Sequence, residues 1–254
     1  MSKTPLKCPH NFVSTSYLKE KIAPEHKINA FALSAGTIEF DLWENGHDLT
    51  LFSNQYFVWE FWKCLQNSPH SLVYNIKYFH NNLKVSEIGF YRNRWYTKFT
   101  DPYQRAALFY LLNRYSETGH FSHCEVTKHN FSPLNLQTLE RFAPVVKTIE
   151  MIYDNQRDFT VSFGHLEPSS VLLVSAGEYK QAFLRGKKVR SPETYYFNHE
   201  KMREYLLSKR QKVVLIYKYN HFTDKFFNNK TYINKFGFVT ENPELAEDLI
   251  VSNF

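Results

Sequence analysis

Glycine is scarce in this sequence, with 8 residues among 254, while the aromatic residues include 23 Phe and 17 Tyr. Nucleotide-binding turns depend on glycine, because only a residue without a Cβ lets the backbone approach a phosphate or sugar closely and adopt positive φ angles. The scarcity therefore disfavours a conventional glycine-rich nucleotide loop. The sequence also contains no P-loop, no GxSxG nucleophile elbow and no HExxH motif, which argues against the enzyme classes that use them.

Cysteine is equally sparse, and the three residues, Cys8, Cys64 and Cys124, lie far apart in the chain. An odd number without CxxC or Cys/His spacing predicts neither a disulfide framework nor a zinc site, and favours reduced, buried thiols. The 11 histidines have no carboxylate or cysteine partner at ligand spacing. We therefore expect no metal ion, and interpret the histidines as surface or DNA-facing residues.

Long hydrophobic runs are absent, and no stretch approaches the roughly 18 apolar residues of a membrane span. The opening sequence MSKTPLKCPHNF also lacks the apolar core of a signal peptide, so we expect a soluble, cytoplasmic protein with no membrane partner. Lys and Arg outnumber Asp and Glu by 31 to 25, giving a formal net charge of +6. A positive field favours polyanions such as nucleic acid, although general solubility explains the charge equally well.

The order of strand-like and helix-like segments predicts an α/β fold. Apolar runs at 28–33 and 48–52 read as strands, 38–43 as helical or turn-like, and 56–66 as a helix. The stretch 72–141 is mainly helical, and is best seen at 101–115, where Asp101 stands at the N-cap and Pro102 at the first helical position. Strand-like runs resume after it, separated by polar or helical stretches such as 199–210. These later strands are 150–153, 171–174 and 213–217.

The ordered segments resemble a known family along nearly the whole chain. Pro5-Leu-Lys-Cys-Pro-His-Asn-Phe12 is similar to a PLKYPGGK start, and residues 30–37 stand where that family has EPFxGxG. Residues 51–55 stand where that family has NDxN. The segments 91–94 and 105–114 are similar to R…FN…rAalFlyLNR. The family is the Dam-type, SAM-dependent DNA adenine methyltransferases.

Three further segments extend this resemblance towards the carboxyl terminus. Residues 153–159 look like the strand and DF turn before the family's catalytic motif, and residues 171–179 fall where fVYxDPPY belongs. The final residues 246–254 resemble the closing kElLitNy. The resemblance implies a Rossmann-like methyltransferase fold with a helical DNA-recognition insertion. It places the two parts of the α/β domain at 1–66 and 146–254, and the insertion at 67–145.

The same resemblance implies where a cofactor and a flipped base would bind, and most of those positions are altered. The cofactor-binding positions would be Phe12, Ala35, Gly36 and Ser53, and the catalytic ones Ser175, Glu178 and Tyr179. Only one glycine of the first turn remains, a serine replaces the acidic ribose ligand, a phenylalanine replaces the lysine, and the Asp-Pro-Pro corner is missing. A site with these changes would position SAM and a flipped base poorly, so we expect no bound cofactor and no catalysis.

Basic residues interleaved with aromatic ones predict contact with double-stranded DNA, because phosphates attract the cations and bases stack on the rings. The alternative for Arg105 and Arg114 is a structural role beside a helix, and for the 185–190 run an ordinary solvated loop. Two other functions stay open: an active adenine methyltransferase that uses SAM, and a scaffold that binds a protein partner or forms a homodimer. The predicted DNA-contacting residues are Arg92, Arg94, Lys98, Arg105, Arg114, Lys128, Arg185, Lys187, Lys188 and Arg190.

Overall fold

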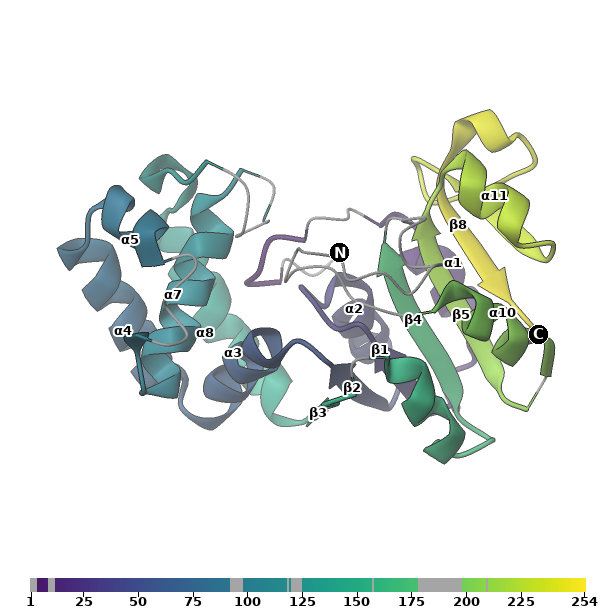
Figure 1. Ribbon diagram of the computed structural model, residues 1–254, viewed down its shortest axis with the longest axis horizontal. Coiled ribbons are helices and arrows are strands. Elements are labelled where there is room, and N and C mark those ends of the chain that lie inside the picture. Colours follow the sequence, from purple (N-terminus) through teal and green to yellow (C-terminus); the bar gives the residue numbers. More distant parts are fainter. Residues whose placement is uncertain are drawn as a thin grey trace.

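An eight-stranded sheet is the centre of the computed structural model, which is drawn in Figure 1. The strand order is β3-β2-β1-β4-β5-β8-β6-β7. The strands are β1 (Ile28–Phe31), β2 (Leu49–Ser53), β3 (Glu150–Tyr153), β4 (Val171–Gly177), β5 (Lys212–Lys218), β6 (Lys230–Asn234), β7 (Val239–Thr240) and β8 (Ala246–Ser252). The structure describes residues 4–8, 12–91, 98–117, 119, 125–156, 158–177, 198–208 and 210–254, with the side chain of residue 159 left out.

Strands β1 to β5 are parallel to one another, and the carboxyl-terminal strands pair antiparallel. Residue Ile28 pairs with Leu49 on one side and with Val171 on the other, so β1 lies between β2 and β4. Strand β8 runs antiparallel to both β5 and β6. The centre of the sheet is covered on both faces, which explains why β1 is buried throughout and why the first four residues of β4 are buried.

Alternate residues of the strands enter two hydrophobic clusters on opposite faces of the sheet. Leu173 of β4 and Val214 of β5 belong to the larger cluster, which also includes residues of the amino-terminal helices. Leu172 and Val213 point the other way, towards Met202. The helices around the sheet are α1 (Thr15–Lys21), α2 (Thr37–Glu44), α10 (His199–Ser208) and α11 (His221–Phe226), with 3₁₀ turns η2 (Phe159–His165) and η3 (Pro243–Leu245).

The chain between β2 and β3 forms a group of helices, which Figure 1 shows on the side of the sheet away from β5 and β8. Helix α7 packs against α3 and α4, and α8 packs against the same two helices. The Asp101 side chain accepts a hydrogen bond from the Tyr103 N–H and Pro102 follows it, which confirms the predicted start of α7. The helices are α3 (Tyr56–Asn67), α4 (Pro69–Asn82), α5 (Val85–Tyr91), α7 (Pro102–Tyr115) and α8 (Pro133–Lys147), with the turn η1 (Lys128–Asn130).

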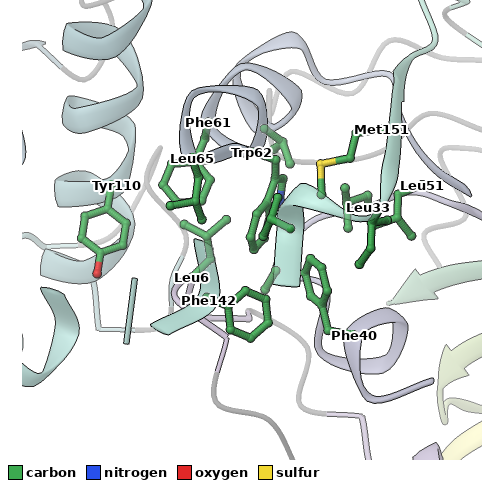
Figure 2. Packing of buried hydrophobic residues seen from close by; sticks show 14 of the residues in the cluster. Leu6, Leu33, Phe40, Leu51, Phe61, Trp62, Leu65, Tyr110, Phe142 and Met151 are labelled. Atoms are coloured by element: carbon green, nitrogen blue, oxygen red, sulfur yellow. The ribbon is translucent and has the colours of Figure 1, made fainter. Parts of the chain in front are cut away.

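Aromatic packing joins this helical group to the sheet. Phe40 of α2 lies 4.7 Å from Phe142 of α8 and 5.0 Å from Trp62 of α3, measured between ring centroids. Figure 2 shows these three rings together, with Met151 of β3 nearby. All three aromatic side chains are buried. The large core is thus continuous from β1 to α7, and the two groups of elements share it.

A buried ion pair fixes α7 to α3. The Arg105 guanidinium binds both carboxylate oxygens of Glu60, with 2.9 Å from Nε to Oε2, and donates to the backbone oxygens of Phe99 and Thr100. The Glu60 side chain is 2% exposed and that of Arg105 13%. Arg105 was predicted to contact DNA, but its donors are directed into the fold, so we leave it out of the DNA surface proposed below.

Substituting Arg105 with methionine is expected to lower the free energy of unfolding by about 3–5 kcal/mol, because Glu60 would be left buried without a cation. The double variant R105M/E60L should recover much of this loss, since it removes both charges. Urea unfolding followed by circular dichroism measures both variants. As a control, Arg141→Met on the exposed face of α8 should change stability by less than about 0.5 kcal/mol. An R105M variant as stable as the wild type would contradict the assignment.

Candidate functional site

The order of the strands reverses between β1 and β4, and in open parallel sheets ligands bind outside the carboxyl ends of the strands at that point. The loop after β1 leads directly into α2. In this loop Ala32 has a φ of 66° and Gly36 a φ of 73°, both in the left-handed region. Ala32 is the one non-glycine residue with positive φ among those described. Its conformation ends β1 at Phe31, two residues before the predicted end of the strand.

Gly36 is needed by the packing of α2 itself. A Cβ at this position would lie 2.3 Å from the Phe40 ring, which is completely buried. Together with the positive φ, this contact explains why a glycine stands here without reference to any ligand. Ala35 beside it is also buried, at 1% exposure. Two of the predicted cofactor positions therefore have a clear role in the core.

A buried carboxyl group and a hydroxyl group connect α2 to β4 where the strand order reverses. Ser175, near the end of β4, donates a hydrogen bond of 2.8 Å to Oε1 of Glu39 in α2. Glu39 is 3% exposed, and burial raises the pKa of its carboxyl group above the usual value. Ser175 was predicted as a catalytic position; its hydroxyl is engaged with Glu39, a residue that the sequence analysis did not single out.

Several other polar groups near the carboxyl ends of β1 and β2 are also hydrogen-bonded within the chain. The Ser53 hydroxyl donates at 3.3 Å to the backbone oxygens of Leu33 and Gln55. The Trp62 indole donates to the Ser34 oxygen at 3.0 Å. Phe31 stacks on Phe52 with 4.3 Å between ring centroids. Ser53, a predicted cofactor residue, is thus 1% exposed and contacts the backbone.

Phe12, the remaining predicted cofactor residue, is 5% exposed and lies beneath Lys218, whose Nζ is 5.8 Å from the ring centroid. The backbone next to it is held by Asp248 of β8, which accepts hydrogen bonds from the N–H groups of Val13 and Ser14 at 2.7 and 3.0 Å. Asp248 also pairs with Lys218 at 2.8 Å. The amino-terminal segment is therefore fixed to the last strands of the sheet.

An aromatic group lies where β2 and β3 end. The rings of Tyr56, Trp59 and Tyr153 have centroid separations of 5.2–5.7 Å. Two buried donors, Nε2 of Gln55 and Nε1 of Trp59, have no hydrogen-bond partner in the structure as described. A planar ligand with acceptor atoms would suit such a group of rings and donors. The sequence analysis missed it, because the partners come from segments about 95 residues apart.

Three cationic residues lie near the carboxyl-terminal end of α7, and two of them, Arg114 and Lys128, were predicted to contact DNA. The Lys7 N–H donates to Asn113 Oδ1 at 2.8 Å, and Asn113 Nδ2 donates back to the Lys7 oxygen at 3.1 Å. The Lys7 ammonium donates to the Ser116 oxygen at 2.7 Å. Lys7 thus contacts Asn113 and Ser116, which lie on either side of Arg114 in the chain. Burial, followed by the Arg114 charge, lowers the pKa of the Lys7 ammonium. We call Lys7, Arg114 and Lys128 the α7 cationic corner.

Arg114 has few partners in this corner. Its guanidinium is partly buried, burial lowers its pKa, and its buried Nε has no hydrogen-bond partner in the described part of the chain. No ion pair of Lys7 or Arg114 occurs among the described residues; Glu117 acts on Lys7 only through its charge. Lys128 is included because its neighbour Thr127 donates its backbone N–H to the oxygen of Tyr115, at the end of α7. The Lys128 ammonium donates to the His80 oxygen at 2.7 Å.

Gly119 lets the amino-terminal segment reach this corner. Its φ is 87°, and a Cβ there would lie 2.7 Å from the Lys7 oxygen. Lys98, another predicted DNA contact, is exposed just before α7. The other predicted residues lie outside the described part of the chain. These are Arg92, Arg94, Glu178, Tyr179, Arg185, Lys187, Lys188 and Arg190.

Comparison with known proteins finds no family model and no curated protein that matches this sequence. Among the described helices, none has both the length and the hydropathy needed to cross a membrane. Within the same residues, no group of three or more His, Cys, Asp or Glu side chains is arranged to hold a metal ion.

Replacing Glu39 with glutamine should change how stability depends on pH. Because the folded protein holds the Glu39 proton more tightly than the unfolded chain, the wild type gains most stability from this group below the ordinary pKa of 4.5 and loses it as pH rises through the raised folded pKa. Glutamine stays neutral and can still accept from Ser175. The stability of E39Q relative to the wild type should therefore increase as the pH rises above 4.5, until the Glu39 carboxyl group of the folded wild type ionises.

Urea unfolding at intervals across this pH range measures the difference between the two proteins. The exposed residue Glu44, at the end of the same helix, gives the control E44Q, for which no comparable trend is expected. A stability difference for E39Q that does not vary with pH would show that the carboxyl group titrates normally.

Proposed function

We propose that this protein binds double-stranded DNA without methylating it, as a degenerate relative of the Dam-type adenine methyltransferases. The observation that carries DNA binding is the α7 cationic corner, where Lys7 and Arg114 come together from positions 107 residues apart with no acidic partner paired to either cation in the described structure. Two neighbouring cations repel each other, and a phosphate group between them would relieve the repulsion while supplying acceptors for the guanidinium of Arg114.

The negative end of the α7 dipole offers a competing, purely structural reason for placing cations there. It accounts for Lys7, whose ammonium binds the Ser116 carbonyl oxygen. It does not account for the Arg114 Nε, which is buried without an acceptor in the described residues. A guanidinium whose Nε is buried without an acceptor is costly unless a ligand supplies one. This difference favours an anion-binding role for the corner.

The absence of methyl transfer is proposed from the state of the strand ends. Ser175, where the resemblance expects the catalytic aspartate, is bonded to Glu39, and Ser53, where it expects the acidic ribose ligand, is bonded to the backbone. A group whose hydrogen bonds are satisfied inside the fold must break them before it can hold a ligand. On this account the protein has a regulatory, recognition or accessory role, of the kind that a phage or other mobile element could encode.

The second candidate function is an active, SAM-dependent adenine methyltransferase with divergent motifs. The observation that favours it is the group of Tyr56, Trp59 and Tyr153 with the unpaired donors of Gln55 and Trp59. It lies beyond the carboxyl ends of β2 and β3, where an adenine ring could stack. This function ranks second because Ser53 and Ser175, at the positions expected to bind the sugar and the target amine, already form hydrogen bonds within the fold.

Neutralising the cationic corner should weaken DNA binding and reduce its salt dependence. For the variant K7Q/R114Q we expect weaker binding to duplexes of any sequence, and a slope of log Kobs against log salt that is smaller by about 2, because two phosphate contacts are lost. Fluorescence anisotropy of a labelled duplex between about 50 and 200 mM salt measures both quantities.

The matched control removes one charge elsewhere. Lys225 is exposed on α11, away from the helical group, and K225Q should leave both the affinity and the slope close to the wild-type values. Unfolding curves for all variants would show that the folds are intact. Wild-type protein that does not bind duplex DNA at low salt, or a K7Q/R114Q slope equal to that of the wild type, would overturn the proposed surface.

A further inference from the structure

The turn between β6 and β7 carries unusually exposed apolar side chains. Phe236 is 72% exposed, Phe238 70% and Val239 58%. We call these three residues the hairpin knob. Scattered apolar residues on a surface are ordinary, but three within four positions on one tight turn form a small patch that another surface can cover. The knob lies at the last strand of the sheet, far along the chain from the α7 cationic corner.

The knob is held in shape by its own turn. The Asn234 side chain accepts hydrogen bonds from the N–H groups of Phe236 and Phe238 at 2.9 and 3.2 Å. The Asn234 N–H donates to the Phe238 oxygen at 2.9 Å, and the Gly237 N–H donates to the Asn234 oxygen at the same distance. A Cβ on Gly237 would lie 2.9 Å from the Val13 oxygen, so the turn rests against the fixed amino-terminal segment. A rigid knob loses little entropy when it binds.

A pocket of matching character lies elsewhere on the same chain. It has a volume of about 240 Å³ and lies between α10, the start of β6 and the end of β8. Its apolar lining includes Leu206, Leu207, Phe227 and Val251, and Arg203 and Asn228 stand at its polar rim. We call it the α10 pocket. A dry apolar cavity of about 150 Å³ is enough to bind benzene, so this pocket can take a phenylalanine ring.

The charges beside the knob and the pocket are complementary. Glu241 and Glu244 are exposed just after β7, and neither forms an ion pair within the described structure. The pocket has one charged lining residue, Arg203, whose guanidinium lies 5.5 Å from the Phe226 ring centroid. Lys235 stands on the other side of the knob, against Phe236. The acidic pair makes the knob a poor wedge for DNA, since it would face phosphates.

We propose that the hairpin knob of one copy of this chain inserts into the α10 pocket of a second copy. The ring of Phe236 or Phe238 fills the apolar pocket, and the carboxylates after β7 approach Arg203 at its rim. A stable interface buries about 1,600 Å² in total, and one aromatic residue contributes at most about 250 Å². The contact is therefore weak and reversible, and forms at high protein concentration or when the chains are brought together on a common ligand.

Two variants remove the two halves of this contact separately. F236A/F238A removes the knob, whose side chains are mostly exposed, and L207D places a carboxylate at the mouth of the pocket, where the leucine is 71% exposed and the carboxylates after β7 would be repelled. Neither change disturbs a buried side chain. The matched controls are Tyr74→Ala, an equally exposed aromatic residue on α4, and Ser208→Asp, the neighbouring position on α10 that lines a different depression.

Sedimentation velocity over a concentration series up to about 0.5 mM measures the association, a range suited to contacts smaller than a standard interface. We expect the wild type and both controls to associate reversibly, and each of the two variants alone to stay monomeric. An equimolar mixture of F236A/F238A and L207D should associate again, because the intact pocket of the first receives the intact knob of the second. Labelling one partner identifies the mixed species.

Three results would overturn the proposal. They are a monomeric wild type at every concentration, a variant that associates as strongly as the wild type, and a mixture of the two variants that stays monomeric. The last result would show that the two surfaces do not bind each other. Circular dichroism of each variant separates these outcomes from loss of folding.

Discussion

The hydrogen bond between Ser175 and Glu39 is the contact on which the interpretation of this fold depends. It joins β4 to α2 at the point where the strand order reverses, which is where ligands enter open parallel sheets. A buried carboxyl group is stable only when it is protonated or well bonded, and its raised pKa reflects this constraint. The loops after β1 and β2 are fixed nearby by the Trp62 indole and the Ser53 hydroxyl, so these strand ends support one another.

The two ends of the molecule have different surface chemistry. At the end of α7, an asparagine holds the amino-terminal segment so that Lys7 lies beside Arg114, and a glycine with positive φ leaves room for that segment. At the last strands, apolar and acidic side chains are exposed instead. A protein with net charge +6 that exposes two glutamates beside an apolar turn can contact a polyanion with one end and a protein with the other.

Local patterns were sufficient to predict the elements with strong periodicity or caps. The strands at 150–153, 171–174 and 213–217 and the capped start of α7 are confirmed, because short runs rich in β-forming residues and N-cap chemistry are local properties. The strands β6, β7 and β8 were not predicted as a unit, since their antiparallel pairing depends on partners distant in sequence. Arg105 was predicted to contact DNA because it is a basic residue in a segment rich in aromatic residues. Its partner Glu60 comes from another helix, 45 residues earlier.

The candidate site was predictable only as a set of positions. Gly36, Ser53 and Ser175 do lie around the carboxyl ends of β1, β2 and β4, yet what each contacts depends on Phe40, the Leu33 backbone and Glu39. Side-chain partners of this kind are set by tertiary packing rather than by spacing along the chain. The position of Lys7 beside Arg114 could not be predicted for the same reason, because a basic residue near the amino terminus gives no local indication of what it contacts.

Isothermal titration of the purified protein with SAM tests the central claim most directly. If the strand ends are closed by their own hydrogen bonds, SAM should bind with a dissociation constant weaker than about 1 mM, the equivalent of about −4 kcal/mol. A micromolar dissociation constant would show that the site accepts the methyl donor, and would contradict the account.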